Sequence, residues 1–123
     1  MQAFKTRWLA RFARNEGIAD KSLRGAIERA GRGLIDADLG GGLIKQRVAR
    51  RGQGRSGGYR VIVGYRIRSR AVFVDGFAKS ARENLEPDEL ISFRRLADYW
   101  LSASATEICD GLEDHSIQEV EDA

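Results

Sequence analysis

The chain has 123 residues, of which 42% are apolar and 32% charged, a balance that fits one folded domain and excludes a disordered chain. No apolar run approaches the roughly 20 residues of a membrane span, so no membrane contact is expected. Cys109 and His115 are the only residues of their types, which excludes a disulfide framework, argues against imidazole catalysis and indicates the cytoplasm.

Two helices are predicted in the first quarter of the chain. The first covers residues 7–14, where Thr6 can cap the N-terminus and Gly17 ends the pattern, with an extended residue or two before it. Its apolar residues at helical spacing are Phe4, Trp8, Leu9 and Phe12. The second helix covers residues 21–31, with Asp20 as its N-cap.

After a predicted loop at residues 36–42, apolar residues recur at every second position, a spacing that indicates strands. Runs rich in Val, Ile, Phe and Tyr predict three of them, over residues 43–49, 59–67 and 71–78. Only about three residues separate the second strand from the third, a spacing typical of a hairpin. The sequence therefore predicts an antiparallel sheet.

A long helix follows the strands. Pro87 suits the first turn of a helix, and one apolar face runs along residues 87–101. Two helices, an antiparallel sheet and a further helix indicate an α+β fold. We expect a domain over residues 1–105 and an acidic C-terminal tail over residues 106–123.

The acidic tail separates charge along the chain. It holds seven carboxylates and no Lys or Arg, so residues 1–105 carry 21 basic and 11 acidic side chains, a net charge of +10. Such a field attracts polyanions. The tail is either solvated, folded back over the basic surface, or packed on the domain, and its apolar residues favour packing. These residues are Ile108, Leu112, Ile117 and Val120.

Residues 47–60 contain five arginines and four glycines and include GQGRSG, which fits the dinucleotide pattern G-x-G-x-x-G. A strand follows these glycines, whereas a dinucleotide site requires a helix there. Predicted strands on both sides also exclude a disordered RNA-coating segment. Two readings remain: a solvated hairpin tip, or a phosphate clamp in which glycine N–H groups act with Arg50, Arg51 and Arg55.

Strand alternation predicts that one face of the sheet is basic while the other packs the helices. The first two strands direct cations to the basic face, and the third contributes an aromatic ring followed by a lysine. These residues are Lys45, Arg47, Arg60, Arg66, Phe77 and Lys79. A nucleic acid fits such a surface, with Phe77 either stacking on a base or packing in the core.

Two segments, LIKQRVARRGQGRSGGYRVIVGY and VFVDGFAKSARENLEPDEL, closely resemble the RelE/HigB-type toxins of bacterial type II toxin–antitoxin systems, in the RelE/ParE superfamily. The resemblance covers roughly residues 3–101. It implies two N-terminal helices packed on a curved antiparallel sheet, followed by a C-terminal helix. It also implies a ribosome-dependent endoribonuclease (an mRNA interferase) that cuts mRNA in the A site of the 70S ribosome.

The same resemblance implies a cognate helix-turn-helix (HigA-like) antitoxin, with operator DNA contacted only through that antitoxin. It assigns Lys45, Arg47, Arg60, Lys79 and Phe77 to the RNA-cleaving face. The ParE branch of the superfamily acts on DNA gyrase instead, so a gyrase-binding toxin or a nucleic-acid-binding module on the same fold is the alternative function.

No metal or cofactor is expected, because carboxylates are scarce on the basic face and the only histidine lies in the tail. The simplest metal-free RNA cleavage uses the substrate's own 2′-OH to attack the adjacent phosphate. That reaction needs a proton acceptor, a proton donor and a stabiliser of the phosphorane. Arg47 and Arg60 suit the stabilising role, since a guanidinium grips two oxygens at once. Lys45 or Lys79, each among other cations, is a candidate for proton transfer. Asp75 is either an alternative base or the ion-pair partner of an arginine.

Overall fold

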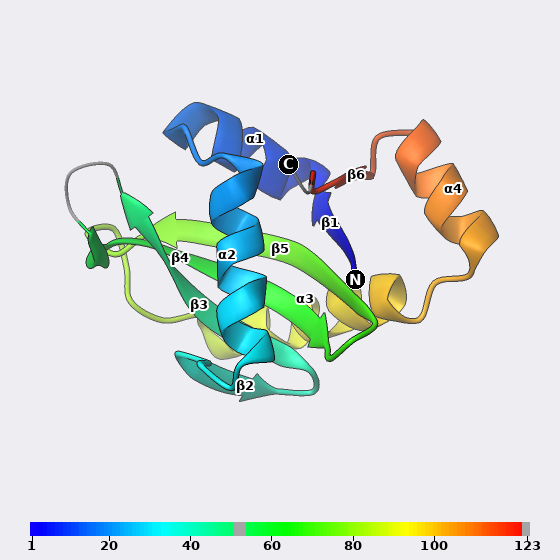
Figure 1. Ribbon diagram of the computed structural model, residues 1–123. Helices are drawn as coiled ribbons and strands as arrows, with labels where there is room; N and C mark the ends of the chain where they lie inside the picture. The colour runs from blue at the N-terminus through cyan, green and yellow to red at the C-terminus, as the bar shows by residue number, and fades with distance from the viewer. Residues whose placement is uncertain (51–53, 122–123) are drawn as a thin grey trace.

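A six-stranded sheet with helices on both faces forms the protein (Figure 1). The computed structural model describes residues 1–50 and 54–121, with the backbone alone at positions 50 and 54–57. The strands lie in the order β2-β3-β4-β5-β1-β6. They are β1 (Gln2–Thr6), β2 (Ala37–Gly40), β3 (Leu43–Arg50), β4 (Gly54–Arg66), β5 (Arg70–Ala78) and β6 (Ile117–Glu119). The helices are α1 (Arg7–Glu16), α2 (Asp20–Gly31), α3 (Pro87–Leu101) and α4 (Ala105–Glu113). This content confirms the α+β class, and no helix in the described part of the chain is long and apolar enough to cross a membrane.

The sheet is mixed, which corrects the prediction of an antiparallel sheet. β1 lies parallel to β5, with Phe4 opposite Val72, while all other neighbouring strands are antiparallel. Phe4 therefore belongs to a strand and not to the helical pattern that its spacing suggests. Its side chain is buried in the cluster with α3, and Leu9 is buried on the opposite side, with α1.

The capping residues predicted for the first two helices are confirmed for α1 and are wrong for α2. Thr6 caps α1, because its hydroxyl accepts a hydrogen bond from the Leu9 N–H at 3.3 Å, and Gly17 ends the helix at φ 70°. Asp20 is not the N-cap of α2, a position that Ala19 holds. The Asp20 carboxylate instead contacts Lys5 Nζ at 2.6 Å and accepts from the Glu121 N–H at 2.9 Å. It ties both ends of the chain to α2.

Part of the predicted loop at residues 36–42 is a strand. β2 pairs with β3, with Ala37 opposite Lys45, and three glycines with φ between 62° and 81° make the turn between them. The pairing supplies backbone hydrogen bonds that the local sequence does not signal. β2 forms the edge of the sheet next to Lys45, so it brings Asp36 and Ala37 beside the basic residues.

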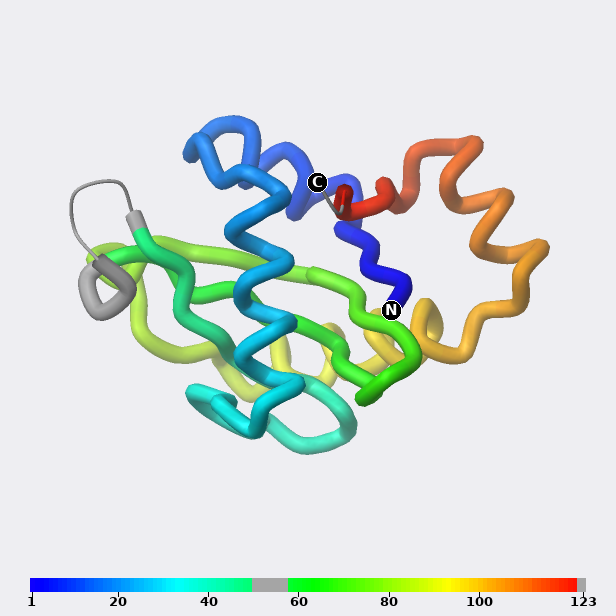
Figure 2. The backbone as a smooth tube through the Cα atoms, viewed as in Figure 1, coloured from blue at the N-terminus to red at the C-terminus, as the bar shows by residue number. Residues whose placement is uncertain are grey.

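Helices cover both faces of the sheet. Figure 2 traces α2 across one face and α3 along the other. The basic face predicted from alternation is therefore not open along its length, because Leu43, Ile62 and Val72 share that face and pack against α3. The apolar stripe of α3 covers these residues. The cations of β3 and β4 lie at the two ends of this face, with Lys45, Arg47 and Arg60 at one end and Arg66 at the other.

β5 contains an irregularity that sets the direction of its side chains. Its register against β4 shifts between Ile62 opposite Asp75 and Val63 opposite Phe73, so Val74 has no counterpart. Such an extra residue reverses the alternation beyond it. As a result Phe77 lies in the cluster with α3, whereas Phe73 lies on the side of α1 and α2.

The acidic tail packs on the domain, as its apolar residues predict. α4 begins with a capping box between Ser104 and Glu107, and β6 pairs antiparallel with β1. Ile108, Ile117 and Val120 are buried, and Leu112 packs against the same cluster as Ile108 and Ile117. β6 thus extends the sheet beyond β1.

Candidate nucleic-acid interface

A pocket of about 260 Å³ lies at the open end of the α3-covered face, where cations of β3 and β4 and the lysine that follows β5 lie together. Arg47 on β3 and Arg60 on β4 are direct neighbours in the register. Lys79 follows β5, and its N–H donates to the Gly58 carbonyl at 3.0 Å. The lining residues, here called the basic pocket, are Asp36, Ala37, Lys45, Arg47, Arg60, Lys79, Glu83 and Asn84. The structure therefore brings together all four residues that the sequence selects for catalysis.

Backbone, amide and carboxylate oxygens hold two of these cations in place. Lys45 Nζ donates to the Glu83 carbonyl at 3.2 Å and to Asn84 Oδ1 at 3.0 Å. Asp36 accepts from the Arg47 N–H at 2.6 Å and pairs with the Arg47 guanidinium at 3.7 Å. The residues from Lys79 to Asn84 thus close one side of the pocket, and Asp36 closes the other.

Arg60 is the most enclosed cation of the basic pocket, at 6% exposure. Its guanidinium donates to the Tyr59 carbonyl at 3.3 Å. Burial, and then the neighbouring Arg47, lower the pKa of Arg60 from its ordinary value, while Asp36 and Glu83 act in the opposite direction. A cation held away from water beside a second cation interacts strongly with an anion that enters the pocket.

Not every predicted contact residue lies at the pocket. Arg66 is six residues from Arg60 on the same strand, which is roughly 20 Å along it. Arg66 donates to the Leu101 carbonyl at 3.1 Å, at the C-terminal end of α3. Phe77 is 6% exposed, and the Arg82 guanidinium lies 5.2 Å from its ring centre, which is the core alternative that the sequence leaves open. The side chains of Arg50, Arg51 and Arg55 lie outside the described residues.

Sequence reasoning missed the three polar residues of the pocket that carry no positive charge: Asp36, Glu83 and Asn84. They come from connecting segments whose sequence shows no periodicity. Arg82 anchors one of these segments, since it forms a salt bridge with Glu89 of α3 and donates to the Asn84 carbonyl at 2.8 Å. Within residues 1–50 and 54–121, no three His, Cys, Asp or Glu side chains gather as a metal-binding group.

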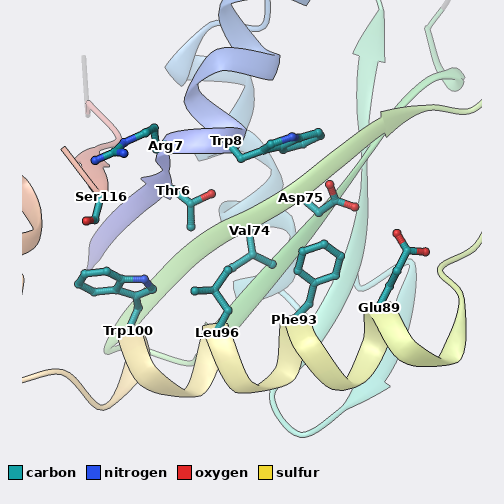
Figure 3. Close-up of a pocket in the computed structure, with 10 residues that line it drawn as sticks. All are labelled: Thr6, Arg7, Trp8, Val74, Asp75, Glu89, Phe93, Leu96, Trp100 and Ser116. Atoms are coloured by element: carbon teal, nitrogen blue, oxygen red, sulfur yellow. The ribbon is translucent and has the colours of Figure 1, made fainter.

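A second cavity, of about 700 Å³, separates α1 from α3 (Figure 3). The side chains of Glu89, Phe93, Leu96 and Trp100 project from α3 toward β5, and Trp8 of α1 faces them. Asp75 lies on β5 between the two helices, so it faces this cavity and does not line the basic pocket. Among the described residues Asp75 has no ion pair, so it is not the ion-pair partner of an arginine. An alternative base at Asp75 would lie outside the basic pocket.

Burial raises the pKa of Asp75 to about 6, and Glu89 adds to the effect. The folded state thus favours the protonated carboxyl. Its contribution to stability is complete below the ordinary value of 3.8 and is lost as the pH rises through about 6.

We expect Asp75→Asn to raise the free energy of unfolding by about 1–2 kcal/mol at pH 8, because a charged carboxylate no longer lies in the cavity. This gain is smaller than the full pKa shift of Asp75 would give, because water in the cavity partly screens the charge. Near pH 4 the gain should vanish. Urea denaturation at both pH values measures it, with the exposed Asp98→Asn on α3 as the control. Equal effects at the two pH values would contradict this assignment.

Comparison with protein-family models gives one finding. The family described as "RelE toxin of RelE / RelB toxin-antitoxin system" matches residues 1–120. No curated protein matches the chain.

Proposed function

The chain belongs to the RelE toxin family, and we propose that it is a toxin that cuts mRNA in the ribosomal A site and so stops translation and growth. One observation carries the proposal: Lys45 and Arg47 of β3, Arg60 of β4 and Lys79, which follows β5, line a single pocket. Because the proposed reaction takes place on ribosomes, we also propose a cytoplasmic location for the protein.

The chemistry of the basic pocket favours a phosphodiester. Two arginines lie side by side in the register, so their guanidinium groups can grip several phosphate oxygens. The net charge of +10 over residues 1–105 attracts polyanions over a longer range. With a volume of about 260 Å³, the pocket has room for one phosphate and part of its sugar, which suits cleavage at a single bond.

In the proposed mechanism the 2′-OH attacks the adjacent phosphorus and the 5′-oxygen departs. Arg60 and Arg47 stabilise the phosphorane, in which negative charge accumulates on the oxygens that do not leave. One group takes the proton of the 2′-OH and another supplies a proton to the 5′-oxygen. Lys45 and Lys79 remain the proposed proton carriers, and Glu83 offers a carboxylate in the same pocket.

Three further proposals concern how RNA is held. Arg50, Arg51 and Arg55 contact the phosphates on either side of the cleaved bond. Arg66 contacts RNA at the far end of β4. Phe77 stacks on a base only after Arg82 moves away from its ring, which requires the Arg82–Glu89 salt bridge to open.

The partner implied by the family is an antitoxin, and we propose the helix-turn-helix (HigA-like) type. The antitoxin would suppress the activity in growing cells and would carry any contact with operator DNA. We further propose that residues 1–105 form the toxin domain and that the acidic tail, residues 106–123, stabilises it.

Mapping of mRNA 5′ ends after a short pulse of toxin expression without antitoxin tests the function. We expect new 5′ ends at defined codon positions inside translated reading frames, and none in the same transcript with its start codon removed, because cleavage depends on the ribosome. Intact mRNA together with DNA-damage markers would indicate a gyrase-directed toxin instead. Growth without arrest would contradict both functions.

A further inference from the structure

Arg47 lies on β3 just beyond the point where the neighbouring strand ends. β2 pairs with β3 opposite Lys45, and among the residues that the structure describes the register ends there, two positions before Arg47. Side chains take over at this point: the Asp36 carboxylate accepts from the Arg47 N–H at 2.6 Å, and the Arg29 guanidinium of α2 donates to the Arg47 carbonyl. Because backbone polar groups need partners, these two side chains replace the missing strand.

The fold holds Asp36 itself in one position. Its N–H donates to Gln46 Oε1 at 2.8 Å. Gln46 is 0% exposed and donates through Nε2 to the Ala26 carbonyl at 3.0 Å and the Leu34 carbonyl at 3.1 Å. The buried amide thus uses its oxygen and both of its N–H donors, and a fully satisfied buried network of this kind is rigid. The Asp36 carboxylate is therefore fixed to α2 and to the segment that follows it.

Asp36 acts more strongly on the backbone of Arg47 than on its guanidinium. The two charged groups are 3.7 Å apart, and the Arg47 side chain is 51% exposed, so the ion pair itself contributes little. The bond from the Arg47 N–H is the stronger contact, because an ionised acceptor shortens and strengthens a hydrogen bond. Asp36 therefore fixes the point from which the Arg47 side chain projects.

The position of Arg47 matters because it lies beside a second cation. Arg60 is its direct neighbour in the register of β3 and β4, and Arg60 is buried whereas Arg47 is exposed. The two like charges repel each other, so Arg47 is the member of the pair that can turn away into water. Burial and Arg47 lower the pKa of Arg60, and Asp36 counteracts them. A hold on the Arg47 backbone likewise opposes the separation of the two guanidinium groups.

We propose that Asp36 is a positioning residue: by holding the Arg47 N–H, it keeps the Arg47 guanidinium beside Arg60, where both groups contact the same phosphate. This inference rests on the RNA-cleaving part of the proposed function. It gives Asp36 no part in proton transfer, so an amide, which still offers an oxygen to the Arg47 N–H, should largely replace the carboxylate. It also gives the short edge strand β2 a purpose, since β2 begins directly after Asp36 (Figure 1).

Single-turnover cleavage of mRNA on programmed ribosomes, with increasing toxin, gives the maximal rate and the toxin concentration at half-maximal rate. Asp36→Ala should lower the maximal rate about tenfold to a hundredfold, the usual effect of misplacing a stabilising group by about an ångström. The half-maximal concentration should not rise, because every cation of the pocket is retained. Asp36→Asn should stay within about fivefold of the wild-type rate, since it loses the charge and keeps the acceptor.

Asp38→Ala is the matched control. Asp38 is an exposed aspartate of β2 that does not line the basic pocket, and its carboxylate accepts from the Gly40 N–H at 2.9 Å. Its removal should leave the cleavage rate within about twofold of the wild type, as for most surface substitutions. Thermal unfolding of all three variants establishes that they fold.

Hydrogen exchange of the Arg47 amide, followed by NMR on the free protein, tests the same contact without RNA. Exchange should be fastest in Asp36→Ala, intermediate in Asp36→Asn and slowest in the wild type. The amide of Ile44, which is buried on the same strand, should exchange at one rate in all three proteins.

Equal losses of cleavage in Asp36→Ala and Asp36→Asn would overturn the proposal, because they would indicate a proton carrier or an effect of charge alone. Wild-type cleavage by Asp36→Ala, or an Arg47 amide that exchanges equally in all three proteins, would overturn it as well. A wild-type protein that cleaves no mRNA would instead refute the proposed function, whereas the exchange rates would still decide whether Asp36 holds Arg47.

Discussion

Replacing Arg60 with alanine should abolish growth arrest and lower the rate of mRNA cleavage by about 10²–10³, the usual cost of removing one donor that stabilises the transition state. Arg60 is the buried cation of the basic pocket, and its neighbour in the register is Arg47. The change therefore removes the charge nearest the place where a phosphorane would form. Primer extension on mRNA from pulse-induced cells gives the cleavage rate.

Burial of Arg60 makes the choice of controls important. Arg60→Ala leaves empty space, so Arg60→Met should be tested beside it, because methionine retains most of the volume and removes the charge. We expect both variants to be inactive and Arg60→Met to melt within a few degrees of the wild type. Arg95→Ala, which removes an exposed arginine of α3 outside the pocket, should remain toxic. Full toxicity of a folded Arg60→Met would refute the role of the pocket.

Deleting residues 105–123 should destabilise the protein severely. Three side chains lost with this segment, Ile108, Ile117 and Val120, are each less than 7% exposed. At about 1.5–3 kcal/mol each, their burial amounts to a large share of the 5–15 kcal/mol that keeps a domain folded. Backbone contacts are lost as well, including the hydrogen bond from the Val120 N–H to the Ala3 carbonyl at 2.8 Å.

Differential scanning fluorimetry of the truncated protein should show a melting temperature lowered by more than about 10 °C, or no cooperative transition. Asp110→Asn with Glu113→Gln is the control, because it removes charge from the exposed side of α4 and leaves the buried residues in place. That double variant should melt like the wild type. An unchanged melting temperature with tighter RNA binding would instead mean that the tail acts by covering the basic pocket.

Gly111 shows how closely α4 packs against α3. A side-chain carbon at this position would lie 2.6 Å from the Trp100 ring, so α4 approaches α3 closely only because residue 111 lacks one. The close approach explains how a short, strongly acidic segment stays attached to the domain. Its charges face solvent while its few apolar side chains enter the core.

Elements whose signals are local could be predicted from the amino-acid sequence alone. Pro87 and the apolar stripe behind it define α3 with the bounds that the structure has, and Thr6 and Gly17 define the ends of α1. Strand alternation selected Lys45, Arg47 and Arg60, because a period of two assigns side chains to faces without knowledge of the partners. These residues and Lys79 lie together in the basic pocket.

Features that depend on partners distant in the sequence could not be predicted and are visible only in the folded protein. β1 is a strand because β5 and β6 lie on either side of it, and β2 is one because β3 does. The register shift at Val74 depends on pairing with β4, so alternation alone could not show that Phe77 lies beneath Arg82. Alternation also cannot tell how much of a face another helix covers. That coverage by α3 divides the basic face into a buried apolar part and a small open pocket, because burying the apolar stripe of α3 is more favourable than leaving it in water.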